Sequence, residues 1–178
     1  MIDESLMFRV SALYPKPHYE FTPEVLAFHE AGHAVVQKAL GYQLKKTAID
    51  RNKLCGISLA VIQTPLQKDK IIKGSSIQEL PLEIRSLIYR RAACKSACIS
   101  MAGEIAERIF MNLEVKGIVL SNSRDSRLAR IALRSARLSA LSAYPDRLAK
   151  DILKKSWSEV ESIASELLER GAINWNEK

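Results

Sequence analysis

The sequence predicts a mainly helical α+β domain with a small β-hairpin beside its first long helix. Apolar residues recur at helical spacing over four stretches, and two β-rich segments separated by a short polar turn follow the first of them. The 178 residues, 47% of them hydrophobic, are enough for one domain with a sizeable core. We expect residues 1–20 to form an N-terminal approach segment and residues 21–178 to form the domain.

The first predicted helix runs from Thr22 to about Gly41. Thr22 is a typical N-cap, Pro23 suits the first helical position, and Glu24 places a negative charge near the positive end of the helix dipole. Gly41 fits the position just past the C-terminus. The residues between these ends form a wide apolar stripe, made of Val25, Leu26, Phe28, Ala31, Val35, Val36, Ala39 and Leu40.

A hairpin and a loop are expected next. Residues 44–50 and 56–63 have the composition of strands, and the second is rich in Ile, Leu and Val. The residues 51–53 between them, Arg-Asn-Lys, supply a turn. Polar and small residues dominate residues 64–80, which we expect to be a loop.

Three further helices are expected over residues 81–111, 122–143 and 145–170. The first and the third open with proline near the first helical position. The second is capped by its first or second residue, Asn or Ser, and the third ends before Gly171. Apolar residues keep helical spacing through each of them.

The composition bears on compartment and partners. We expect no membrane span, because no apolar run reaches the ~18 residues that a span needs. An odd number of cysteines argues against a secreted disulfide framework, so we expect a cytoplasmic protein. The cysteines themselves are expected to be small buried core residues: Cys55, Cys94 and Cys98.

The net charge of +7 raises nucleic acid or an acidic surface as a partner. Four arginines at helical spacing would form a basic stripe: Arg127, Arg130, Arg134 and Arg137. A solvated helix face is the commoner explanation for such a stripe. No aromatic residues are interleaved with the arginines, so nucleic acid is not the expected partner.

The first predicted helix contains the candidate metal ligands and the candidate catalytic base. His29 and His33 are two of the only three histidines, and four residues of spacing place both on one helix face, where they can bind one ion. Glu30 is angled to reach a water on that ion without ligating it. This H-E-x-x-H arrangement is typical of zinc hydrolases, in which the glutamate is the general base.

A catalytic zinc ion takes three protein ligands and keeps one position open. Candidates for the third ligand are Glu104, Glu107, Asp125 and His18. Asp125 lies in the first turn of a predicted helix, where an acid also compensates the dipole. Glu104 and Glu107 are candidates for contacts behind the metal ligands, although solvent exposure is their ordinary assignment. Near them, Gly103 marks a close helix approach or a break. Spacing alone leaves the third ligand open.

Four stretches, in order, resemble the peptidase domain of the FtsH family of ATP-dependent zinc metalloproteases. They are the zinc helix over residues 28–36, a strand–turn–strand over 46–57, an Ala-Gly-rich helix over 101–107, and the place of the family's aspartate ligand at 121–125. The resemblance implies one Zn²⁺ held by His29, His33 and Asp125, with Glu30 as catalytic base. The family's membrane helices and ATPase module have no counterpart here, so we expect a stand-alone domain.

The predicted function is that of a zinc metalloendopeptidase acting on unstructured or locally exposed polypeptide, without ATP on its own. The strand at Gly56, Ile57, Ser58 and Leu59 is expected to hold the substrate backbone by β-augmentation. A homo-oligomer or a separate ATPase is a further expected partner.

The alternative is a catalytically silent, zinc-stabilised binding module whose basic stripe contacts nucleic acid or an acidic protein. A structural zinc site would need a fourth protein ligand, for which Cys94 or Cys98 is the candidate. The presence of Glu30 counts against this alternative, because a structural site has no use for a base.

Overall fold

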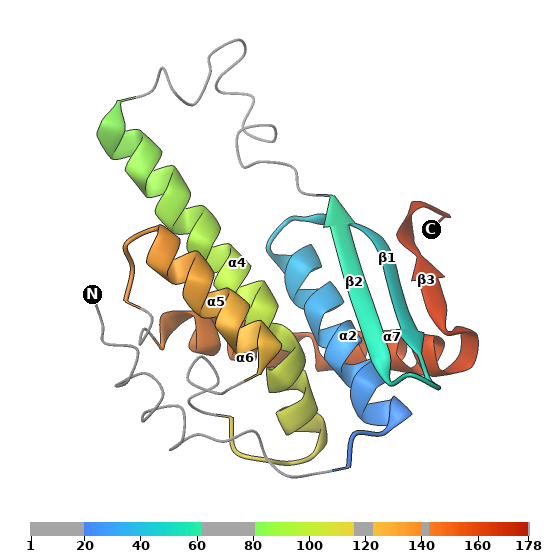
Figure 1. Cartoon of the computed structure of the whole chain (residues 1–178). Coiled ribbons are helices and arrows are strands. Elements are labelled where there is room, and N and C mark those ends of the chain that lie inside the picture. The colour runs from blue at the N-terminus through green and yellow to red at the C-terminus, as the bar shows by residue number, and fades with distance from the viewer. Residues whose placement is uncertain (1–19, 62–80, 116–122, 140–142, 178) are drawn as a thin grey trace.

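The computed structural model describes residues 20–61, 81–115, 123–139 and 143–177 (Figure 1). Within these ranges the chain forms five α-helices and a three-stranded antiparallel sheet, which confirms the predicted mainly helical α+β fold. The expected N-terminal segment, including His18, and the expected loop over 64–80 lie outside the described residues. None of the described helices combines the length and the hydropathy needed to cross a bilayer.

The helix α2 (Pro23–Ala39) lies at the centre of the fold, between α4 on one side and the sheet on the other (Figure 1). Thr22 caps it as predicted, with its hydroxyl accepting a hydrogen bond from the Val25 amide at 3.3 Å. Gly41 follows its end with φ of 83°, a left-handed conformation that glycine adopts without strain. Because α2 has neighbours on both sides, most of its side chains are buried.

The predicted hairpin is present. Strand β1 (Gln43–Asp50) pairs antiparallel with β2 (Cys55–Val61), and β3 (Ala172–Asn174) pairs with the other edge of β1. The order β2-β1-β3 leaves β2 at the sheet edge. Strand β3 is only three residues long, too short to give a strand signal in the sequence. The Trp175 indole next to it donates to the Thr47 hydroxyl at 2.9 Å.

Two further helices lie beside α2, one packed directly on it and the other packed on the first. The helix α4 (Leu82–Phe110) crosses α2 at Gly32, where an added β carbon would lie 2.6 Å from Ala106 Cβ and 2.8 Å from the Ala102 carbonyl oxygen. Helix α5 (Arg124–Ser135) packs on α4. The absence of a side chain at position 32 therefore permits the close approach of α2 and α4.

The predicted end of the third helix is wrong. Helix α5 ends at Ser135 rather than near residue 143, because the chain turns out of the helix at Arg137, which has φ of 55°. The Leu138 amide donates to the Leu133 carbonyl at 2.9 Å, the pattern of a Schellman motif. An arginine in the left-handed position hides this end from a sequence analysis that looks for glycine.

The predicted basic stripe consequently extends past the end of α5. Arg127 and Arg134 are exposed on α5, but Arg130 is half-buried, and Arg137 lies beyond the helix. Burial, together with the positive charges of Arg134 and Arg127, lowers the pKa of Arg130, while the negative charge of Glu104 raises it. Arg127, Arg130 and Arg134 thus lie on α5 near enough for their charges to interact, and Arg137 follows the end of the helix.

The predicted fourth helix is two helices, α6 (Tyr144–Lys155) and α7 (Trp157–Arg170), separated at Ser156 with φ of −115° and ψ of 28°. Helix α6 packs on α4, whereas α7 packs on α2. The bend at Ser156 therefore lets each half bury its apolar face against a different partner. Gly171 ends α7 with φ of 75°, as predicted.

The cysteines differ in environment. Cys98 is buried in the core, and Cys94 packs against the core, as the composition predicts. Cys55 is exposed at the start of β2, which corrects the prediction that it is a core residue. It is the first residue of β2, which is an edge strand of the sheet.

Candidate metal centre

The structure brings together the two histidines of α2 and the aspartate in the first turn of α5. His29 Nε2 and His33 Nε2 lie 3.0 Å apart, and Asp125 Oδ2 lies 3.2 Å from the first and 3.7 Å from the second. Tetrahedral zinc with bonds of about 2.0–2.1 Å separates its ligand atoms by ~3.3 Å. Both the donor types and their spacing therefore fit one zinc ion.

A buried ion pair between Glu104 and Arg108 helps to hold the turn that carries Asp125. The Ser123 hydroxyl caps α5 by accepting from the Ser126 amide at 3.1 Å, and this fixes the turn that carries Asp125. The Ser126 hydroxyl donates to Glu104 Oε2 at 3.5 Å, and Arg108 donates to Glu104 Oε1 at 2.9 Å. Glu104 is thus buried between α4 and α5, which corrects its expected solvent exposure.

Two further contacts orient the imidazoles. Glu107 Oε1 lies 2.5 Å from His29 Nδ1, and His33 Nδ1 donates to the Ile99 carbonyl at 2.7 Å. With each Nδ1 occupied in this way, both Nε2 atoms remain for a metal ion, the usual arrangement around metal-bound histidines. Glu107 is fully buried, so solvent exposure is the wrong assignment for it as well.

Gly103 lies directly under the two rings. A β carbon at this position would come within 2.5 Å of His29 Nε2 and 2.6 Å of His33 Nε2. The helix α4 runs through Gly103 without interruption, so the glycine marks a close approach and not a break. Only a residue without a side chain leaves room for both imidazoles here.

The surroundings of His29 favour its protonated form in the metal-free protein. Burial lowers the pKa of His29, but hydrogen bonds to Asp125 and Glu107 and the charges of Glu107 and Glu30 raise it to about 10. Burial raises the pKa of Asp125, but the hydrogen bonds from His29 and His33 bring it well below its ordinary value. A metal ion would take the place of the proton on His29.

Glu30 lies beside this cluster, only 5% exposed, between α2 and β2. Its Oε2 is buried and has no hydrogen-bond partner within the described residues. Burial raises the pKa of Glu30, and the nearby His33 and His29 offset part of that effect. Gly56 makes room for the carboxylate, because a β carbon there would lie 2.7 Å from Oε1. An unpaired buried carboxylate oxygen suits a proton acceptor.

An open cleft runs over the cluster, between β2 and α5. Of the predicted substrate-binding residues, Gly56, Ile57 and Ser58 line it, whereas Leu59 does not. Ser58 is tied to α2, since Gln37 Nε2 donates to its carbonyl at 3.3 Å and its hydroxyl donates to Gln37 Oε1 at 3.1 Å. Apolar side chains line much of the remaining wall: Phe21, Leu26, Leu54, Ile99 and Leu128.

Several cleft residues carry no functional signal that was recognised in the sequence, Cys55 and Arg124 among them. A signal was present for Arg124, because it begins a helix, where a positive charge opposes the dipole and therefore needs another explanation. No known protein-family model matches the chain, and no curated protein shows significant similarity to it.

Proposed function

We propose that this protein is a zinc-dependent metalloendopeptidase that hydrolyses peptide bonds in unstructured or locally exposed polypeptide. The observation that carries the proposal is the juxtaposition of three zinc-type donors, from His29, His33 and Asp125, with the buried unpaired oxygen of Glu30. A structural zinc site would close its fourth position with another protein ligand. Neither Cys94 nor Cys98 belongs to the cluster among the described residues.

The chain's own residues divide the chemistry between them. When bound, zinc supplies Lewis-acid polarisation of the scissile carbonyl and lowers the pKa of water toward ~7. Glu30 accepts the proton of the attacking water at Oε2 and then donates it to the leaving amine. In the metal-free protein burial raises the pKa of Glu30, which makes its carboxylate a stronger proton acceptor than that of an exposed glutamate.

The edge strand supports a polypeptide substrate. Strand β2 has β1 on one side and no other strand of the described residues on its cleft side. An extended peptide adds to such an edge through main-chain hydrogen bonds, which recognise backbone more than sequence. Folded proteins cannot offer a free strand, so they would require a partner ATPase or an oligomer that unfolds them. A cytoplasmic location, expected from the cysteine count, belongs to the same proposal.

The regulatory alternative would use the arginines of α5 to contact nucleic acid or an acidic protein. Of these, Arg130 is half-buried and Arg137 lies outside the helix, and the alternative gives no role to Glu30. The proposed peptidase therefore accounts for more of the site.

The test is Glu30→Gln, with metal content and cleavage of an unfolded protein measured on the same preparations. We expect about one zinc per chain in both proteins and a fall in cleavage of about 10²–10⁴-fold in the variant. Glu24→Gln, an exposed glutamate on the same helix, should cleave normally. Equal cleavage by wild type and Glu30→Gln would overturn the proposal.

A further inference from the structure

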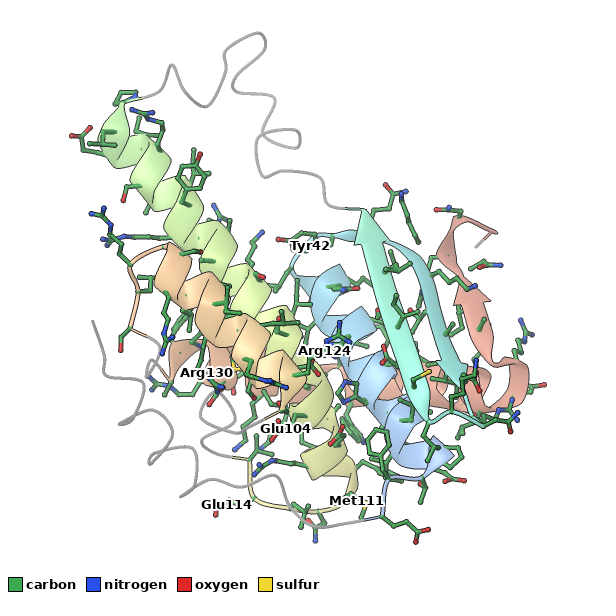
Figure 2. The ribbon with its side chains drawn as sticks, viewed as in Figure 1. Tyr42, Glu104, Met111, Glu114, Arg124 and Arg130 are labelled. Carbon is green, nitrogen blue, oxygen red and sulfur yellow. The ribbon has the colours of Figure 1, made fainter. Side chains whose placement is uncertain are left out.

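A positive charge lies at the edge of the metal centre and has no part in it. Arg124, the first residue of α5, is exposed and lines the same cleft as His29, His33 and Asp125. Figure 2 shows Arg124 at the end of α5 that faces α2. The cleft therefore combines a metal-binding cluster with a guanidinium.

Within the described part of the chain, Arg124 makes no hydrogen bond or ion pair. Other arginines do: Arg108 bonds to Glu104, Arg170 to Glu166, and Arg51 to the Glu169 carbonyl. A cation in the first turn of a helix also opposes the helix dipole. Stability of the fold thus gives no reason for an arginine at this position.

The surroundings of Arg124 favour an anionic ligand. The carboxylates of the cleft lining, Glu30 and Asp125, are both committed to the proposed zinc centre. The positive end of the α5 dipole adds to the attraction for a negative group. A carboxylate is the group that matches a guanidinium best, because the two can form paired hydrogen bonds.

We infer that Arg124 is a specificity-determining residue that selects substrates with a carboxylate close to the bond cleaved. The carboxylate is either an acidic side chain or the free C-terminal carboxylate of a peptide. Leu128, 47% exposed and one turn further along α5, lines the cleft beside Arg124, and Ile57, also 47% exposed, lines it from β2. Apolar residues flanking the acidic group therefore fit the same cleft. This inference rests on the proposed peptidase function.

The experiment uses unstructured fluorogenic peptides with apolar flanks and no other charge. One pair differs by Glu against Gln beside the cleaved bond, and a second pair differs by a C-terminal carboxylate against an amide. We expect wild type to prefer the acidic member of at least one pair by roughly ten- to a hundredfold in kcat/KM, the range of a charge-assisted hydrogen bond. The pair that shows the preference identifies the source of the carboxylate.

Variants of Arg124 assign the preference to that side chain. Arg124→Gln should abolish it, and Arg124→Glu should reverse it in favour of a Lys-containing peptide. Arg127→Glu is the matched control, because Arg127 is exposed on the same helix outside the cleft lining and the change in net charge is the same. The control should keep the wild-type preference.

Binding separates this inference from the proposed function. The dissociation constants of the same peptides are measured with Glu30→Gln and with the Glu30→Gln, Arg124→Gln double variant, neither of which should cleave them. If wild type cleaves none of the peptides, but Glu30→Gln binds the acidic peptides more tightly and this preference needs Arg124, the recognition role is upheld and the peptidase is overturned. Cleavage without preference, or an equal loss on every peptide in Arg124→Gln, would overturn the recognition role instead.

Discussion

His29 of α2 and Glu107 of α4 are joined by a hydrogen bond of 2.5 Å between Nδ1 and Oε1, although 78 residues separate them in the sequence. The glutamate is fully buried and holds one imidazole with its Nε2 toward His33 and Asp125. A carboxylate in this position raises the basicity of a metal-binding histidine and fixes its orientation.

Glu107→Gln should therefore weaken zinc binding without abolishing it. The amide can still accept a hydrogen bond from His29 but lacks the charge, so we expect a loss of about 10–100-fold in zinc affinity. Competition with a fluorescent chelator measures the effect. Glu83→Gln, on the exposed first turn of the same helix, is the control and should bind zinc as wild type does. An unchanged affinity in Glu107→Gln would mean that its contact with His29 is only structural.

Asp125→Ala should lose zinc while the helical fold survives. The loss follows from removal of one of three donors, whereas its role at the helix end is worth only ~0.3–1 kcal/mol. Metal content after dialysis measures the first effect, and thermal unfolding in chelator measures the second. Stoichiometric zinc in this variant would show that another group completes the site.

Gly103→Ala should abolish zinc binding, because the new β carbon would lie 2.5 Å from His29 Nε2 and displace the rings. Its fold should persist, since side chains can move aside and alanine favours a helix by up to ~1 kcal/mol over glycine. Gly32→Ala should instead lower the stability of the fold. There the new carbon meets the Ala102 carbonyl at 2.8 Å, and the free energy of unfolding of the zinc-free protein should fall by about 1–3 kcal/mol.

Zinc affinity should rise with pH. The pKa of His29 in the metal-free protein is about 10, so at lower pH a proton must leave before zinc can bind. One released proton gives about a tenfold gain in apparent affinity per pH unit between about pH 7 and pH 9. Chelator competition at several pH values measures it, and a flat profile would contradict the proton displacement.

Protonation of His29 stabilises the metal-free fold, so the stability of that fold should fall as the pH rises. A histidine whose pKa is raised by folding stabilises the folded state fully below its unfolded value of ~6.5. That contribution is lost as the pH rises through about 10. Denaturant unfolding in chelator across this range should show the decline.

The sequence was most informative where local signals are strong. Thr22, Pro23 and Gly41 predict both ends of α2, and the four-residue spacing predicts that His29 and His33 share a face. The predictions that were wrong concern features that depend on tertiary packing. Helix α5 ends at Arg137 without a glycine, and the bend at Ser156 arises because α6 and α7 pack on different helices.

The residues inside the metal site show the same contrast between local sequence signals and tertiary packing. A glutamate on a helix surface and a glutamate under an imidazole look alike in sequence, so Glu107 was not distinguishable from Glu83. Only the resemblance to the FtsH peptidase domain favours Asp125 over Glu104 and Glu107 as the third ligand, because spacing does not distinguish them. Its nearness to the histidines depends on how α5 packs on α4, and no local pattern encodes that packing.

The origin of the ligands in two separate helices has a consequence for folding. Helix α5 packs chiefly on α4 and has little direct contact with α2, so an ion shared by His33 and Asp125 would close a loop of about ninety residues. Because these distant ligands meet only in the folded chain, the binding free energy of the metal becomes folding free energy. Loss of the ion would release α5 before the rest of the domain, so the element that carries Arg124 would be the first to exchange its amide hydrogens.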